Sequence, residues 1–122
     1  MNTEHLIEQI AASAIVFLDA QGVIRSWNAG ARAITGYRAD EVLGKPLFML
    51  FPDDVHGRRL REDLIERVSK AGRVAVESWV VRKNGRSIWT RNVIDRIHAK
   101  NGSAALCWLS HEMFGDEELL PT

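Results

Sequence analysis

The chain has 122 residues, which is enough for one domain with one sizeable hydrophobic core. Sixteen lysines and arginines balance sixteen aspartates and glutamates, so the chain lacks the basic field that nucleic-acid binding needs. Its single cysteine excludes an internal disulfide, and no apolar run approaches the ~20 residues of a membrane span. We therefore expect a cytoplasmic domain that binds neither nucleic acid nor membrane.

The first part of the chain predicts a flanking helix, a β-hairpin and a short helix. These elements are expected, in chain order, at residues 1–12, 14–18, 23–27 and 29–35. The hairpin turn falls at residues 19–22, between two runs rich in β-forming residues. Asn28 is a good N-cap for the short helix, and Gly36 suits the left-handed conformation that often ends a helix.

The second part of the chain predicts a long helix followed by three strands. They are expected at residues 55–71, 74–82, 87–97 and 104–109. The helix carries an apolar stripe that includes Leu60, Leu64 and Val68, and Asn84-Gly85 is a strong hairpin signal. Strands joined by tight turns are antiparallel, and the helices fall between the second and third strands. The sequence therefore predicts an α+β fold with the helices on one face of the sheet.

Three stretches of the sequence resemble PAS domains. They are residues 24–31 (IRSWNAGA), residues 35–45 with the motifs TGY and EVLGK, and residues 82–89 (RKNGRSIW). The resemblance implies the PAS fold, a five-stranded antiparallel sheet in the order 2-1-5-4-3 with helices over one face. It divides the chain into a flanking helix at residues 1–12, a PAS domain at residues 13–112, and a tail at residues 113–122 that leads to an output domain.

PAS domains are sensory and dimerisation modules, usually joined to a kinase, cyclase, phosphodiesterase or DNA-binding output. The resemblance therefore implies a sensor of signal transduction or transcription regulation, with a small-molecule ligand, a homodimer or both. In many members the last strand ends in an Asp-Ile-Thr-like motif, whereas this chain has the sequence SHEM at residues 110–113. A helix-turn-helix output beyond the chain end therefore fits as well as the histidine kinase of a two-component system.

The sequence departs from the cofactor-binding branches of the family at the positions that hold the cofactor. Flavin photosensors carry a reactive cysteine in the central helices, whereas Cys107 is expected on the last strand. Haem-binding members place a histidine on the long helix, where the matching residue here is Arg59 and His56 lies about one turn earlier. We therefore expect neither haem nor flavin, and assign no cofactor and no metal ligand.

Alternation along the strands, oriented by the resemblance, defines an inner face that mixes apolar residues with a few polar ones. Such a mixture is typical of a small-molecule pocket. The predicted ligand-binding residues are Val16, Leu18, Leu47, Leu50, Leu64, Ile88, Thr90, Asn92, Leu106 and Trp108. Asn92 stands out because a buried mid-strand amide needs partners, either a ligand or neighbouring backbone and water. Trp108 either stacks on a ligand or fills the cavity, and the second case leaves a ligand-free interaction module.

The opposite, outer face is also apolar, which is unusual for an antiparallel sheet with one solvated side. Its set comprises Ile15, Phe17, Trp27, Trp79, Val81, Trp89, Val93 and Leu109. A patch of this size needs a cover, because exposed it would favour aggregation. We expect the N-terminal helix to cover part of it and a second subunit the rest, although the helix alone is an alternative. The predicted dimer interface comprises Leu6, Ile7, Ile10, Phe17, Trp79, Trp89 and Leu109.

Five residues are expected to support the fold rather than to bind a ligand. They are Asn28, Gly36, Glu41, Lys83 and Gly85. The resemblance brings Glu41 and Lys83 together as an ion pair, which at an exposed site is worth only ~0–1 kcal/mol.

No residue is assigned a catalytic role, so we do not expect an enzyme. The chain has no glycine-rich phosphate loop, no His-Glu-x-x-His and no Gly-x-Ser-x-Gly motif. The enzyme alternative is a small α+β isomerase or hydrolase with Asp95 or Asp19 as its base, although Asp19 also suits the turn before Gly22.

Overall fold

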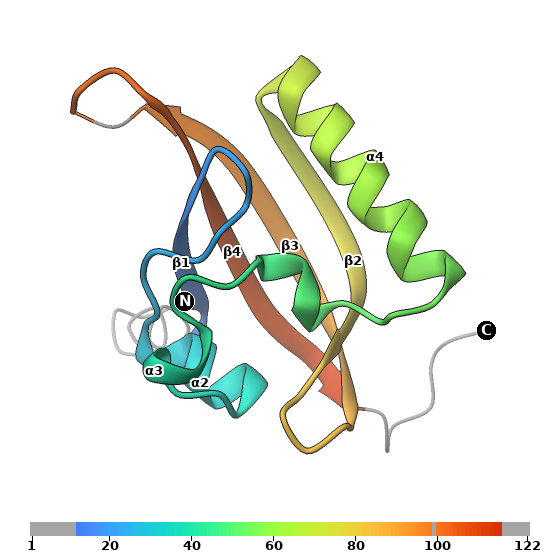
Figure 1. Cartoon of the computed structure of the whole chain (residues 1–122). Helices are drawn as coiled ribbons and strands as arrows, with labels where there is room; N and C mark the ends of the chain where they lie inside the picture. Colours follow the sequence, from blue (N-terminus) through green and yellow to red (C-terminus); the bar gives the residue numbers. More distant parts are fainter. Residues whose placement is uncertain (1–11, 99, 116–122) are drawn as a thin grey trace, which may run out of the picture.

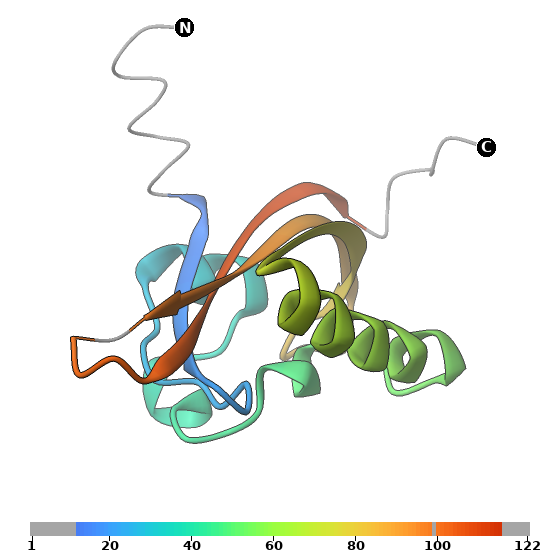
Figure 2. The ribbon, with the colours of Figure 1, turned by 90° about the horizontal axis from the view of Figure 1, so that it is seen from above.

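The computed structural model describes residues 12–98 and 100–115, so the predicted N-terminal helix lies almost wholly outside the described residues. In chain order the elements are β1 (Ala14–Asp19), α2 (Ala29–Thr35), α3 (Ala39–Val42), the 3-10 helix η1 (Leu47–Leu50), α4 (Val55–Ala71), β2 (Arg73–Val81), β3 (Ser87–His98) and β4 (Ala104–Gly115) (Figure 1). The strands form one antiparallel sheet in the order β1-β4-β3-β2, with the helices on one side of it (Figure 2). This arrangement confirms the predicted α+β architecture.

The described sheet has four strands where the sequence predicted five, because residues 23–27 do not form a strand. Ile24 makes only an isolated bridge to Leu18. The N–H of Phe17 bonds at 2.9 Å to the side-chain oxygen of Ser26 rather than to a backbone carbonyl, which interrupts the ladder. The backbone of Ile24 bonds instead to the loop that follows α3. Without this strand, the order of the remaining strands agrees with the prediction.

The last strand is longer than predicted. β4 pairs with β3 over its whole length, with a register shift between Trp89 and Thr90. The apolar pattern ends at the polar residues Ser110, His111 and Glu112, and the predicted strand therefore stops at residue 109. Pairing needs only backbone groups, so these side chains do not end it.

Asn28 and Gly36 bound the short helix α2, and Asn28 also ties it to the sheet. The side-chain oxygen of Asn28 accepts hydrogen bonds from the N–H of Ala31 at 2.9 Å and of Ile15 at 3.0 Å. One carboxamide therefore caps α2 and ties it to β1. Gly36, after the helix, has a φ of 79°, in the left-handed region that favours glycine.

The long helix α4 begins at a close backbone contact. The carboxylate of Asp54 caps it by accepting from the N–H of Gly57 at 2.8 Å. A Cβ on Gly57 would lie 1.7 Å from the carbonyl oxygen of Pro52, so only glycine fits without moving the preceding segment. Farther along, Leu64 and Val68 are buried against the sheet. α4 therefore covers β2 and β3, while α2 covers β1.

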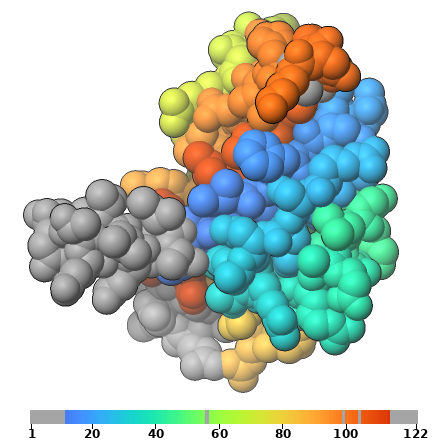
Figure 3. All heavy atoms as spheres, turned by 90° about the vertical axis from the view of Figure 1, so that its left-hand side faces the viewer, coloured from blue at the N-terminus to red at the C-terminus, as the bar shows by residue number. Residues whose placement is uncertain are grey.

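The β2–β3 hairpin is held against α2 and α3 (Figure 3). The N–H of Lys83 donates to the carbonyl of Thr35 at 2.8 Å, and its Nζ pairs with Glu41. The carboxylate of Glu41 also accepts from the N–H of Arg38 at 2.9 Å, and these two partners hold the pKa of Glu41 below its usual value. Gly85 supplies the positive φ of 87° that the hairpin turn requires. The hairpin and α3 are thereby joined.

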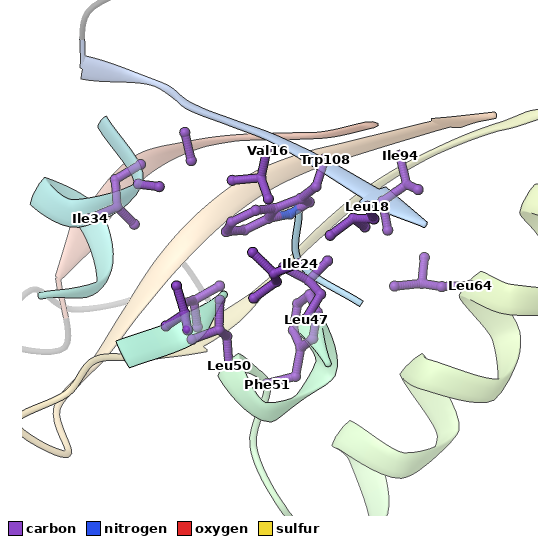
Figure 4. Close-up of a cluster of buried hydrophobic side chains, with 14 of the residues drawn as sticks. Val16, Leu18, Ile24, Ile34, Leu47, Leu50, Phe51, Leu64, Ile94 and Trp108 are labelled. Carbon is purple, nitrogen blue, oxygen red and sulfur yellow. The ribbon is translucent and has the colours of Figure 1, made fainter. Parts of the chain in front are cut away.

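The hydrophobic core lies between the sheet and the helices, with Trp108 at its centre. The Trp108 side chain is fully buried, and its ring lies between Val16 of β1 and Ile24 (Figure 4). Fully burying one large apolar side chain is worth about 1.5–3 kcal/mol. The core therefore depends strongly on this indole.

Candidate ligand-binding site

One pocket of about 290 Å³ opens where α4, η1 and the turn after β1 meet the end of the sheet; we call it the terminal pocket. This volume is close to the lower end of the ~300–1,000 Å³ range of small-molecule sites. Its walls are apolar side chains from β1, η1, α4, β3 and β4: Leu18, Phe48, Leu64, Val68, Ile94 and Leu106. Figure 4 shows Leu64 of α4 facing Leu18 and Ile94 across the space between helix and sheet.

Three exposed polar residues, Gln21, Ser69 and Arg96, lie on the rim of the terminal pocket. Arg96 connects β3 to the end of α4 through two hydrogen bonds. Its Nη1 donates to the carbonyl of Ser69 at 2.9 Å, and its backbone N–H donates to the carbonyl of Gly72 at 2.8 Å. A cation beside the last carbonyls of a helix is favourable, because the helix dipole is negative there. The guanidinium is therefore held at the pocket mouth.

At the centre of the inner face, a polar network holds the fully buried side chain of Trp108. We call this the central network: Ser78, Thr90, Asn92 and Trp108. The amide nitrogen of Asn92 lies 3.0 Å from the hydroxyl oxygens of both Ser78 and Thr90, and its oxygen accepts from the indole N–H of Trp108 at 3.0 Å. The polar groups of Asn92 are thus satisfied inside the protein.

One polar group beside the central network has no hydrogen-bond partner among the described residues. Ser110 pairs with Asn92 across the strands and is only 1 % exposed. Its hydroxyl makes no hydrogen bond within the part of the chain that the structure describes. A buried hydroxyl without a partner is destabilising, so this position is a weak point of the core.

The predicted ligand-binding residues divide between the terminal pocket and the core. Leu18, Leu64 and Leu106 line the pocket. The other seven are buried elsewhere in the interior: Val16, Leu47, Leu50, Ile88, Thr90, Asn92 and Trp108. Sequence reasoning did not single out Gln21, Ser69 or Arg96. For Arg96 a signal existed, since it continues the inner-facing series of β3 two residues after Ile94.

The outer face carries apolar side chains with no helix or strand over them among the described elements (Figure 2). Trp79 and Trp89 pair across β2 and β3, with ring centroids 5.1 Å apart and nearly perpendicular planes. Phe17 is 48 % exposed, and Leu109 is half-buried. The remaining predicted interface residues, Leu6, Ile7 and Ile10, lie outside the described residues.

The placement of Trp27 on the outer face was wrong. Its side chain packs against the core, and its indole N–H donates to the carbonyl of Tyr37 at 2.9 Å. Alternation assigns faces only within a strand, and residues 23–27 do not form one.

The two carboxylates of the enzyme alternative have structural partners. Asp19 accepts from the backbone N–H groups of Gln21 and Val23 and pairs with Arg25. The bond from Val23 is the largest of the effects that lower the pKa of Asp19, whereas a general base working near neutral pH has a raised one. Asp95 pairs with Arg73 at 3.4 Å.

Cys107 lies half-buried on the outer face, opposite Asp95. Burial, and then the charge of Asp95, raise the pKa of its thiol, so it is the neutral, less reactive form that is favoured. Within residues 12–98 and 100–115, no three His, Cys, Asp or Glu side chains gather as a metal site would require. Among the same residues no helix is long and apolar enough to cross a membrane.

Comparison with known proteins gives a consistent result. The family model of the PAS fold matches residues 2–111. Two-component system protein A of Emericella nidulans is 33 % identical over 95 residues, which cover 76 % of this chain and 14 % of that protein. The chain therefore spans only a small part of the length of this relative.

Solved structures with the same fold include PAS domains from two bacteria. A PAS domain from Colwellia psychrerythraea superposes with a TM-score of 0.76 at 24 % identity, over 91 % of this chain and 94 % of that one. The PAS domain of the quorum-sensing receptor RpfR of Cronobacter turicensis, in complex with BDSF, gives 0.61 at 26 % identity, over 84 % and 95 %.

Proposed function

The chain belongs to the PAS family, and on that premise we propose that it is a sensor domain whose ligand binds in the terminal pocket. Relatives in two-component and sensor proteins support a role in sensory signalling. The observation that carries the ligand proposal is the pocket itself, with apolar walls, a polar rim and about 290 Å³ of space. The complex of the RpfR PAS domain with BDSF supports small-molecule binding by a domain of this fold.

The proposed mechanism is a shift between two packings of α4 on the sheet. The pocket walls come from α4 on one side and from β1, β3 and β4 on the other. A ligand between them therefore stabilises one distance and one angle between α4 and the sheet. A ligand can shift such an equilibrium only by its differential affinity for the two states. The change in packing is then transmitted to an output domain beyond residue 122, which is a kinase, a cyclase or a helix-turn-helix domain. The domain acts in the cytoplasm and catalyses no step.

The pocket proposal is tested by filling its mouth. Ile65 and Val55 are both exposed on α4, at 56 % and 52 %, but only Ile65 lines the terminal pocket. A ligand at 100 times its Kd stabilises the folded state by about 2.7 kcal/mol, which is roughly 10 °C in Tm. In a thermal-shift screen, compounds that raise the Tm of the wild-type chain should fail with Ile65→Trp and still act on Val55→Trp. Equal shifts in both variants would place the ligand elsewhere.

A second candidate function is homodimerisation through the outer face, favoured by the apolar side chains exposed there. Phe17 and Leu43 are matched in exposure, at 48 % and 46 %, but only Phe17 lies on the outer face of the sheet. Sedimentation should give a dimer for the wild-type chain and for Leu43→Glu, and a monomer for Phe17→Glu. A wild-type monomer, or a Phe17→Glu dimer, would contradict the proposal.

A further inference from the structure

The terminal pocket is electrostatically one-sided. Of its described lining residues, Arg96 alone carries a charge; the others are apolar or neutral. The pocket therefore presents a cation and no anion to anything that enters it. Because the walls have low polarity, a charge on the rim acts on a bound ligand more strongly than it would in water.

Arg96 also differs from the arginines nearby in having no carboxylate partner. Arg73 pairs with Asp95 at 3.4 Å, and Arg91 pairs with Glu77 at 3.8 Å. Among the described residues no carboxylate pairs with Arg96, whose side chain instead donates one N–H to the Ser69 carbonyl. A guanidinium has five N–H donors in a planar fork, so the side chain keeps donors for a second acceptor while the first bond holds it in place.

We propose that the terminal pocket selects small monocarboxylates with an apolar body. The carboxylate accepts hydrogen bonds from Arg96 at the mouth, and the body packs on Leu64, Ile94 and Leu106 in the interior. Arginine suits this role because its fork matches the two oxygens of a carboxylate. The volume of about 290 Å³ restricts the body to a short alkyl chain or a single ring. This inference rests on the proposed function and gives it a ligand class.

The test compares an acid with its uncharged analogue of the same shape. The probes are octanoate and octanamide, and phenylacetate and phenylacetamide, titrated into the 122-residue chain with amide chemical shifts as the readout. Because hydrogen bonds to charged groups exceed neutral ones by roughly 1 kcal/mol, we expect each acid to bind about 3- to 10-fold more tightly than its amide. Arg96→Gln should remove this preference.

Arg91→Gln is the matched control, because it removes the same charge from the same strand on the outer face. It should leave the preference for acids intact, and Arg96→Lys, which keeps the charge, should retain part of it. The Tm of each variant shows whether it folds. Amides that bind as tightly as acids, or a preference that survives Arg96→Gln, would overturn the carboxylate inference and leave the pocket as a neutral ligand site. If no probe shifts the amides of Leu64 and Ile94 up to its solubility limit, this inference falls and the proposed function loses its support as well.

Discussion

At the centre of the inner sheet face Asn92 and Trp108 bond to each other, whereas at the end of the same face Arg96 borders an open pocket. Both regions place polar groups among apolar walls, which is the pattern that predicts a ligand site. They differ in whether the polar group has partners within the protein. In the central network the carboxamide is satisfied and fixes a large side chain. At the terminal pocket the Arg96 guanidinium retains hydrogen-bond donors, so this end of the face suits ligand binding.

The largest expected effect on stability comes from removing the side chain at the centre of the inner face. Trp108→Ala removes a fully buried indole and leaves the oxygen of Asn92 without its donor. We expect a loss of about 3–5 kcal/mol in the free energy of unfolding, measured by urea denaturation. Leu106→Ala at the partly exposed pocket wall is the control and should lose less. Equal losses would mean that the centre and the end are not packed differently.

Breaking the central network without removing the indole should have the next largest effect. Asn92→Ala leaves the Trp108 N–H and the Ser78 hydroxyl without their partner, and each buried unsatisfied group is unfavourable. The expected loss is about 1–3 kcal/mol in unfolding free energy. Asn84→Ala, at the exposed hairpin turn, is the matched control and should stay within about 1 kcal/mol. A neutral Asn92→Ala would show that the network does not hold the centre closed.

Ser110→Ala should have a smaller effect of the opposite sign. The substitution removes a buried hydroxyl that has no partner in the described structure, and it keeps the backbone pairing of β4. Stability should therefore rise by up to about 1 kcal/mol in the same denaturation experiment. A loss of more than about 1 kcal/mol would instead reveal a hydrogen bond to Ser110 that the central region needs.

The smallest expected effect concerns the turn at the pocket rim, and it depends on pH. Interactions in the folded state lower the pKa of Asp19, so its ionised form stabilises folding above the unfolded pKa of about 3.9. This contribution should be lost as the pH falls through the folded pKa. At pH 7, Asp19→Asn should lower stability by less than about 1 kcal/mol, because its partner Arg25 is largely exposed. A difference between wild type and variant that grows on acidification would contradict this assignment.

Elements with local signals could be predicted from the sequence. Asn28 and Gly36 bound α2, and Gly72 ends α4 with a φ of 79°, because caps and left-handed residues act on their own neighbours. The predicted strand at residues 23–27 was wrong, because its backbone contacts are set by residues outside its own neighbourhood. Its backbone turns away to the loop after α3, and Ser26 replaces a ladder bond, which depends on residues far along the chain.

The candidate site shows the same limit. The sequence marks Asn92 as a buried amide that needs partners, but it cannot say whether these are a ligand or the protein. The structure supplies Ser78, Thr90 and Trp108. Arg96 looks like one of many surface arginines in the sequence, and gains its place only where the end of β3 meets the end of α4.

The terminal pocket is tested most directly by an amide and side-chain chemical-shift titration of the wild-type chain with octanoate, because the Trp108 indole and the Leu64 and Ile94 amides report the two regions separately. If the ligand binds in the terminal pocket, octanoate should cause large shifts at Leu64, Ile94 and Arg96 and little change at the Trp108 indole N–H. Large shifts at the Trp108 indole and the Asn92 carboxamide, with the amides around the terminal pocket unchanged, would contradict binding in that pocket and place the sensing site at the centre of the sheet.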